Sequence, residues 1–387
     1  MNRGKYKRLL LAIITLLIML FLVLKIDLRR MDLNGINLNR NDQVSLYDVF
    51  SEIGIVPLET KEESLITTIS EIQYYNNCYY ILDRRLQEVL CFGEEGNYLF
   101  KISKQGKGPG EYIHITHFSV DPYNSQLLLL DPSAGKIHCF DINGNYISSL
   151  SLGEVLGYNK VFALNHDLIL LWSVTDYELL YYSRNDEKFI QKEFEIPGNT
   201  VIARFNSLNP VYQSGHHTFF LPAFKRDIYN ISNLPIEKHF TWCFGEMNNT
   251  SRQINRVLNM LQRGDNIYPG EVVEKKLLNY HILNAYENTR FMIVILEFDD
   301  DFKHIFIDKE KNKSYVFTNF IEKVALFRPA FNGNNLIMYS RNYDYSRVER
   351  NLANFNKEFL SDENQKIIAS HDPERDNPFL VLYILKN

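Results

Sequence analysis

Short apolar runs separated by turn-forming residues make up most of this chain. From about Ile53 to Leu385 the runs have the length of strands and continue with interruptions. Such runs predict β-strands rather than amphipathic helices. The chain also contains 26 Phe and 24 Tyr, whose flat rings favour a pleated, half-buried surface. The pattern therefore predicts an all-β domain.

An internal repeat gives this strand pattern a period. Residues 76–102 align without a gap with residues 124–150, which begin 48 residues later. Matched positions include Asp83 with Asp131, and Gly96 with Gly144. Asp and Gly-Asn are residues that form tight turns between strands. A period of roughly 40 to 50 residues with several strands in each copy is typical of β-propeller blades.

Fainter copies extend the repeat to the end of the chain. They lie at about 168–196, 218–244, 290–317 and 336–385, which makes six sets of strands in all. Blades cannot bury their faces alone, so the ring must close. We expect residues 55–60 to pair with residues 378–383 for this purpose. The sequence thus predicts an all-β, six-bladed β-propeller over residues 51–387.

Two stretches interrupt the strand pattern. Residues 250–280 and residues 345–370 place apolar side chains at helical spacing. We therefore predict helical insertions in the propeller at about 250–280 and 345–370.

The N-terminus predicts the compartment. Basic residues lie between positions 3 and 8, and an apolar run follows at residues 9–24. As a helix this run would measure roughly 24 Å and, slightly extended, could cross a bilayer. Residues 1–28 are thus predicted to be a basic cytoplasmic end with a transmembrane signal anchor; a cleaved signal peptide is the alternative. Residues 29–50 then read as a polar tether, and the propeller would lie in the cell envelope, on the periplasmic or extracellular side.

Charge and cysteine content narrow the possible partners. The formal net charge is −5 and no basic face is visible beyond the N-terminus, so a nucleic-acid partner is not expected. Four cysteines are too few for a disulfide scaffold in a chain of 387 residues. Cys78 and Cys91 could form a cross-strand disulfide; small buried thiols are the alternative.

Three segments carry a family resemblance. They are Gln105–Tyr112 (QGKGPGEY), Asn377–Leu382 (NPFLVL) and Val56–Thr60 (VPLET). With these segments the chain resembles the uncharacterised six-bladed β-propeller proteins of Bacteroides, which are similar in architecture to NHL-repeat and TolB-like propellers. The resemblance covers about residues 50–387 and implies a six-bladed ring and an exported location. It implies no activity, and this chain lacks the lipoprotein cysteine of many members.

The loop that carries this motif is also the main candidate site. Its backbone N–H groups and carboxylate could face a ligand, together with the histidines that follow. The candidate ligand-binding residues are Gly108, Pro109, Gly110, Glu111, Tyr112, His114 and His117. The alternative is that Gly and Pro only shape the connection between blades, while Tyr112 packs and Glu111 satisfies loop donors.

Metal binding and cofactor chemistry are not predicted. His114 and His117 point to opposite faces on a regular strand, and His216-His217 belongs to another blade. Asp299-Asp300-Asp301 reads as a solvated hairpin turn, because it lacks the wider spacing of a calcium loop. No metal, no cofactor and no catalytic residue are therefore assigned.

The function predicted from the sequence is a membrane-anchored propeller that binds an unknown protein or glycan partner. An enzyme with its site at the channel mouth, a lyase or hydrolase acting on a carbohydrate, lactone or peptide-like substrate, is the alternative. A scaffold within an envelope complex is a third possibility, and it predicts exposed apolar surface on one face.

Overall fold

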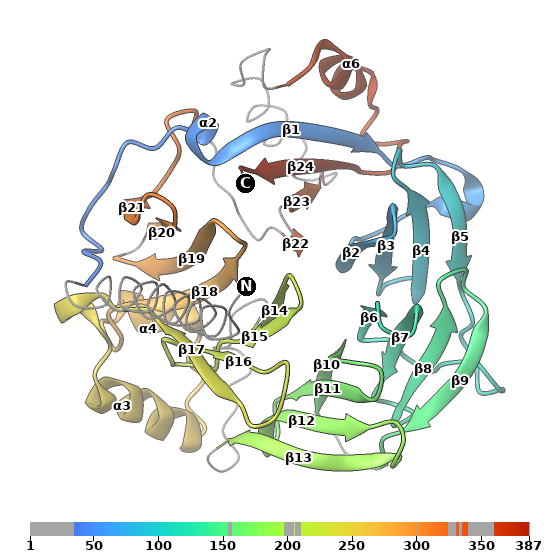
Figure 1. Ribbon diagram of the computed structural model, residues 1–387, viewed down its shortest axis with the longest axis horizontal. Coiled ribbons are helices and arrows are strands. Elements are labelled where there is room, and N and C mark those ends of the chain that lie inside the picture. The colour runs from blue at the N-terminus through green and yellow to red at the C-terminus, as the bar shows by residue number, and fades with distance from the viewer. Residues whose placement is uncertain are drawn as a thin grey trace, which may run out of the picture.

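The computed structural model shows six four-stranded antiparallel sheets arranged around a central channel (Figure 1). The structure describes residues 35–153, 157–196, 205, 210–299, 301–323, 330–332, 335–339 and 360–386. The prediction of an all-β, six-bladed propeller is confirmed.

Blades 1 to 3 follow the chain without a break. Blade 1 contains β2 (Glu71–Tyr75), β3 (Cys78–Asp83), β4 (Glu88–Gly93) and β5 (Tyr98–Ile102). Blade 2 contains β6 (His117–Asp121), β7 (Gln126–Asp131), β8 (Lys136–Asp141) and β9 (Tyr146–Ser151). Blade 3 contains β10 (Tyr158–Ala163), β11 (Leu168–Ser173), β12 (Tyr177–Ser183) and β13 (Lys188–Glu195).

Blades 4 and 5 are separated by the first helical insertion. Blade 4 contains β14 (Val211–Ser214), β15 (His217–Phe220), β16 (Asp227–Asn230) and β17 (Glu237–Thr241). The insertion contains the 3-10 helix η3 (Gly245–Met247), α3 (Ser251–Gln262) and α4 (Pro269–Glu274). Blade 5 contains β18 (His281–Glu287), β19 (Phe291–Phe298), β20 (Asp301–Asp308) and β21 (Lys313–Phe317). The prediction of helices within 250–280 is confirmed.

Blade 6 closes the ring with strands from both ends of the chain. It consists of β22 (Ala330–Asn332), β23 (Asn335–Tyr339), β24 (Phe379–Leu385) and, outermost, β1 (Phe50–Pro57). Ile55 pairs with Val381 and Val56 with Leu380, so the predicted closure is confirmed. The helix α6 (Asp362–Ser370) forms part of the second predicted insertion, whose residues 345–359 lie outside the described residues.

The N-terminal residues of the described chain correct the predicted tether. Residues 35–49 lead into the short helix α2 (Leu46–Val49), with the 3-10 helix η1 (Glu62–Ser64) following β1. Leu38, Val44 and Leu46 are buried in the core that blades 4 to 6 share. Asp42 also donates to and accepts from the backbone of Val316 on β21. The tether prediction for 29–50 is therefore wrong from residue 35 onward, because apolar residues hidden among polar ones anchor this segment on the ring.

The predicted membrane span at residues 9–24 lies outside the described residues. Within residues that are described, no helix is long and apolar enough to cross a membrane.

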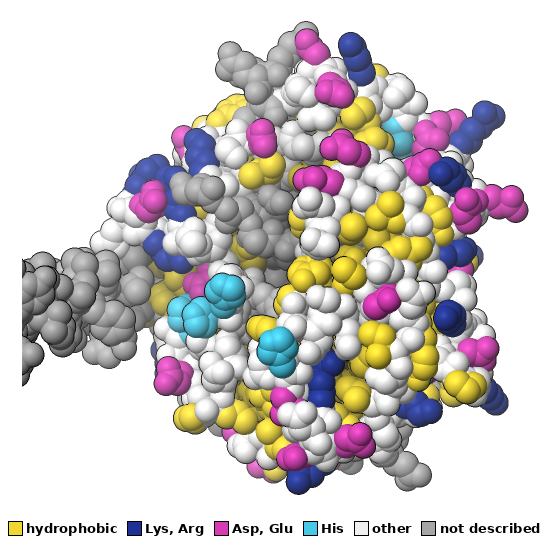
Figure 2. All heavy atoms as spheres, turned by 45° about the vertical axis from the view of Figure 1, so that its right-hand side comes forward, with side chains coloured by type: hydrophobic (Ala, Val, Ile, Leu, Met, Phe, Trp, Pro, Cys, Tyr) yellow, Lys and Arg dark blue, Asp and Glu magenta, His cyan; other side chains and the backbone are white. Residues whose placement is uncertain are grey.

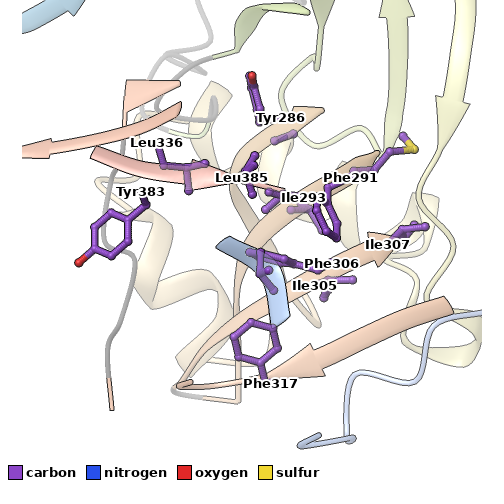
Figure 3. Close-up of a cluster of buried hydrophobic side chains, with 14 of the residues drawn as sticks. Tyr286, Phe291, Ile293, Ile305, Phe306, Ile307, Phe317, Leu336, Tyr383 and Leu385 are labelled. Carbon is purple, nitrogen blue, oxygen red and sulfur yellow. The ribbon is translucent and has the colours of Figure 1, made fainter. Parts of the chain in front are cut away.

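The core lies between neighbouring blades rather than at the centre of the ring. One cluster joins blades 1 and 2, for example through Leu82 and Leu129, and the next joins blades 2 and 3. The largest cluster joins blades 4, 5 and 6 with residues 38–55. In Figure 3, aromatic and aliphatic side chains of blade 5, such as Phe306, lie beside Leu336 and Leu385 of blade 6. This packing explains why each blade alone would expose its faces.

The aligned segments 76–102 and 124–150 contain three strands each, β3 to β5 and β7 to β9, and leave out the innermost strands β2 and β6. Several of the innermost strands carry polar side chains, such as those of Glu71 and Gln73 on β2. Gln73 explains this polarity, because its side-chain amide donates to the carbonyl of Phe118 and accepts from the N–H of Val120. It thereby satisfies backbone groups that a strand edge would leave unpaired.

The two faces of the ring carry different loops. Because consecutive strands are antiparallel, the turn between the second and third strands lies on the same face as the connection to the next blade. We call this the linker face. The turns between the first and second strands and between the third and fourth strands form the opposite face, which we call the hairpin face.

Candidate functional site

The candidate loop crosses the linker face from β5 to β6 and is closed on itself. Gln105 and Tyr112 form a parallel bridge, in which the N–H of Gly106 donates to the carbonyl of Tyr112 at 2.9 Å. The Glu111 carboxylate accepts a hydrogen bond from the N–H of Gly108 at 2.7 Å. Glu111 therefore satisfies a donor of its own loop, as the alternative interpretation predicted.

Gly110 is required at its position for two reasons. Its φ is +76°, a conformation that side chains with a Cβ rarely adopt. A Cβ there would also lie 2.8 Å from the ring of Tyr146 on β9. Pro109 beside it is exposed. The glycine thus allows the loop to pack closely on the outer strand of blade 2.

Tyr112 anchors the end of the loop. Its ring is buried, and its hydroxyl donates to the carbonyl of Gln87 at 2.6 Å and accepts from the N–H of Lys104 at 3.1 Å. Burial raises the pKa of Tyr112 to about 12. The phenol is therefore a neutral structural group that joins the loop to the β3–β4 turn.

Two aspartates hold the same kind of connection in blades 1 and 2. Asp83 accepts hydrogen bonds from Thr67 and Thr68 of the preceding connection and from Arg85 and Leu86 of the following turn. These aspartates are the matched pair of the sequence repeat, so the sequence does contain a signal for them. It indicates the turn, however, and not the bonds to the distant connection.

Asp131 repeats this role in blade 2. It accepts from the N–H groups of Ile113 and Ala134. Burial alone would raise the pKa of Asp131, but the His138 ring at 3.7 Å and the backbone N–H donors outweigh it and lower that pKa.

His117 and His114 separate, as predicted for a strand. His114 is exposed on the connection, whereas His117 begins β6 and is buried in the wall of the channel. The Nδ1 atom of His117 accepts the N–H of Val161 on β10 at 3.3 Å. Because Nδ1 is an acceptor, the ring is neutral.

The pKa of His117 agrees with this tautomer. Burial, followed by the positive charges of Lys160 and Arg84, holds the pKa of His117 well below its usual value. Its Nε2 atom lies 3.6 Å from the carboxylate of Glu71, a separation that would form an ion pair only with a protonated ring. We therefore regard this contact as a weak polar one.

Glu71, His117 and Lys160 form a polar group on the innermost strands. They come from the innermost strands of blades 1, 2 and 3, and the Lys160 ammonium lies 3.9 Å from the Glu71 carboxylate. We call these three residues the mouth cluster. Sequence reasoning found only His117, because the strands that carry Glu71 and Lys160 have no clear apolar pattern.

The remaining histidines do not join this cluster. His216 and His217 lie at the β14–β15 turn on the hairpin face. In the part of the chain that the structure describes, no three His, Cys, Asp or Glu residues come close enough to hold a metal ion. Asp299 and Asp301 flank the β19–β20 turn, where Asp299 has a φ of +51°, so the predicted hairpin turn is confirmed.

The four cysteines are free thiols. Cys91 lies opposite Tyr80 in the β3–β4 hairpin, whereas Cys78 lies opposite Gly93. The hairpin register thus differs from the one that the disulfide alternative needs. Burial raises the pKa of the Cys91 thiol, as expected for a small core residue.

A small cavity lies on the linker side between blades 4 and 5. Its volume is about 20 Å³, room for one water molecule. His281 lines it, and its Nε2 atom is hydrogen-bonded to the carbonyl of Phe205 at 3.0 Å. This space is too small for an organic ligand.

These features define a closed six-bladed β-propeller in which buried carboxylates hold linkers and the mouth cluster brings together side chains of three blades. The chain belongs to the family described as "Domain of unknown function (DUF4934)", whose profile matches residues 29–384. A comparison with curated proteins finds no match.

Two solved structures from Bacteroides are similar. One is a Bacteroides fragilis protein whose export is inferred, with 17% identity, a TM-score of 0.71 and coverage of 90% of this chain and 98% of that one. Another is a Bacteroides vulgatus member of the DUF4221 family, with 11% identity, a TM-score of 0.49 and coverage of 87% and 98%. At this identity the first likeness shows the fold alone. The predicted resemblance to a Bacteroides-type six-bladed propeller family is confirmed.

Proposed function

We propose that this protein is an extracytoplasmic propeller, held in the cell envelope by residues 9–24, that binds a protein or glycan partner without catalysing a reaction. The apolar run at 9–24 with its basic flank supports the anchor. The inferred export of the similar Bacteroides fragilis protein supports the location.

One observation carries the non-catalytic role. Three of the polar side chains that the sequence offered as ligand-binding groups are already bonded within the fold, whereas His114 is exposed. His117 uses Nδ1 for the backbone of Val161, Glu111 closes its own loop, and the Tyr112 hydroxyl joins two backbone segments. A general base needs a free lone pair that reaches the substrate. These side chains instead build a rigid ring that presents its loops.

The test combines binding with activity. Full-length protein solubilised from envelope membranes is used as bait for envelope proteins and on a glycan array, and it is also assayed with lactone, glycoside and peptide substrates. We expect saturable binding and no turnover. His117→Gln keeps a neutral polar side chain and is expected to leave binding unchanged. Turnover that is lost in His117→Gln would overturn the proposal and establish the enzyme alternative.

The anchor needs its own test. Intact mass of the protein from membranes distinguishes an uncleaved chain from one that has lost the residues up to a signal-peptidase site. We expect the uncleaved mass and retention in the membrane pellet after alkaline extraction. A shorter mass with release by alkali would show a cleaved signal peptide.

A further inference from the structure

Exposed apolar side chains are unequally divided between the two faces of the ring. Among the described residues, six large apolar side chains that are more than one-third exposed lie in or beside linker-face loops: Leu65, Leu86, Ile113, Tyr268, Phe302 and Ile321. Three more lie on outermost strands: Leu99, Ile147 and Ile190. Leu234 lies in a hairpin-face turn.

Charge is divided in the same way in blades 1 and 2. Five exposed basic residues lie on or next to the linker-face loops of these blades: Arg84, Arg85, Lys104, Lys107 and Lys136. The hairpin-face turns of the same blades lie at residues 76–77, 94–97, 122–125 and 142–145. They contain asparagines and the acidic residues Glu94 and Glu95, and they contain no Lys or Arg. Figure 2 shows the side of the ring with these blades, where Lys and Arg side chains project along the right-hand edge together with Asp and Glu side chains. The same loops also expose Glu111, and Glu62 and Glu63 are exposed near Leu65 in the connection that enters blade 1. Basic residues still outnumber acidic ones in the described linker-face loops of blades 1 and 2, where Leu86 and Ile113 are exposed.

The chain also reaches the ring at the linker face. The N–H of Ile36 donates to the carbonyl of Cys243, in the connection that follows β17, and Gly35 lies against Gly245. Residues 25–34 separate this point from the apolar run at 9–24 and span at most about 35 Å when fully extended. If residues 9–24 are in the bilayer, a tether of this length keeps the ring close to it, and the linker face is where the tether meets the ring.

We propose that the linker face, centred on blades 1 and 2, lies against the anionic surface of the membrane that holds the anchor. This inference rests on the anchor in the proposed function and adds the orientation of the ring. Leu65, Leu86 and Ile113 enter the headgroup region, and the basic side chains in the loops of Leu86 and Ile113 pair with anionic headgroups. The hairpin face then points away from the membrane and meets the partner.

The spacing of the apolar side chains favours a membrane over a protein partner. They are single residues on loops of at least four different blades or connections, distributed around one face of a disk. A protein interface has a contiguous buried core surrounded by a polar rim. Separate apolar side chains mixed with cations suit a flat, fluid, anionic surface instead.

The test is lysine footprinting of the unaltered full chain. The protein is reconstituted in phosphatidylcholine vesicles with and without phosphatidylglycerol, and flotation establishes that it is inserted. Acylation rates of individual lysines are then measured by mass spectrometry. We expect Lys104, Lys107 and Lys136 to react at least threefold more slowly in anionic vesicles, and this protection to be lost in 0.5 M salt, because salt screens exposed charges.

Lysines of the hairpin face are the internal control. Lys188 and Lys311 are well exposed on turns of that face and should react at the same rate in both vesicles. Equal protection of both faces, or protection of neither in inserted protein, would overturn the orientation while leaving the anchor intact. Failure to float with vesicles would instead contradict the anchor in the proposed function.

A pair of matched variants tests the apolar part. Leu65→Ser/Leu86→Ser/Ile113→Ser removes apolar side chains from the linker face, and Leu99→Ser/Ile147→Ser/Ile190→Ser removes equally exposed ones from the outer strands. The first variant should lose most of the lysine protection and the second should keep it. Circular dichroism confirms that both are folded, and single Leu86→Ser replaces the triple variant if it is not. Equal behaviour of the two variants would contradict the proposal.

Discussion

Blades 1 and 2 form their loops and turns with residues of their own sequence, whereas blades 4 to 6 depend on segments from elsewhere in the chain. In blades 1 and 2, Asp83 and Asp131 each hold both a connection and a turn. Blade 4 has strands of four or five residues, and its core is shared with blades 5 and 6 and with residues 38–55. Blades 1 and 2 thus combine the apolar packing between blades with aspartates that bond neighbouring connections, whereas the core of blades 4 to 6 also includes residues that precede the first strand.

Replacing Asp83 should have the largest effect, and it tests whether the aspartates stabilise blades 1 and 2. Asp83→Ala leaves the N–H groups of Thr67, Thr68, Arg85 and Leu86 without their acceptor in a buried place. Hydrogen bonds to a charged group contribute about 1.5–3 kcal/mol each, and their losses overlap, so we expect roughly 3–5 kcal/mol of destabilisation in urea. Asp186→Ala, at an exposed turn of blade 3, is the control. A cost below that of the control would show that Asp83 is not the link.

Truncating Leu46 tests whether the segment before the first strand stabilises blades 5 and 6. Leu46 is fully buried against blades 5 and 6, although it lies before the first strand. Leu46→Ala should cost about 2–4 kcal/mol in chemical denaturation, as other buried leucines do. Leu65→Ala, which removes the same atoms from an exposed position, should cost less than about 0.5 kcal/mol. Equal costs would mean that residues 35–49 do not contribute to the core.

Glu178 contrasts with the aspartates. It is buried between blades 3 and 4, and burial raises its pKa to about 8, although the N–H of Ala223 and the charge of Lys225 oppose the shift. Between pH 4.5 and 8 the unfolded chain has lost this proton and the folded chain retains it. The free energy of unfolding should therefore fall as the pH rises through this window.

Glu178→Gln isolates this effect. The amide resembles the protonated acid, so the stability of the variant relative to the unaltered protein should increase from pH 5 to pH 8 by roughly 2–3 kcal/mol. Urea denaturation at several pH values measures the difference. A difference that does not change with pH would show that Glu178 ionises normally.

The fold could be predicted from sequence wherever local chemistry determines it. The Asp-led turns, the Gly-Asn hairpins and the closure of the ring by residues 55–57 with 379–381 all follow from residue types and spacing. The innermost strands of blades 1 and 2 could not be found, because polar side chains interrupt their apolar pattern, and Gln73 and His117 bond the edge of the next blade. The burial of residues 35–49 was also hidden, since their partners lie more than 200 residues away.

The sequence predicted where the candidate loop lies, but it did not predict what the side chains of the loop do. The motif at 106–112 does mark an ordered loop on the linker face. Its carboxylate and phenol, however, are consumed by hydrogen bonds that sequence alone cannot show. Lys160 and Glu71 joined His117 only when three blades came together around the channel.

Gly110 and Gly153 together separate two costs of replacing a glycine by alanine: the strain of a positive φ and the steric contact of the new methyl group. Gly110 and Gly153 have similar φ angles, +76° and +71°. A Cβ on Gly110 would meet the Tyr146 ring at 2.8 Å, whereas one on Gly153 would have no atom within 4 Å. Gly→Ala at either site costs about 1 kcal/mol or more for the positive φ alone.

The steric contact adds a cost only at Gly110. We therefore expect Gly110→Ala to be less stable than Gly153→Ala by roughly 1–2 kcal/mol in urea, since overpacking a buried contact costs about that much. Tyr146→Leu should shrink the difference, because it removes the ring that the new methyl group meets. If the two alanine variants are equally stable, the loop does not need close packing on blade 2.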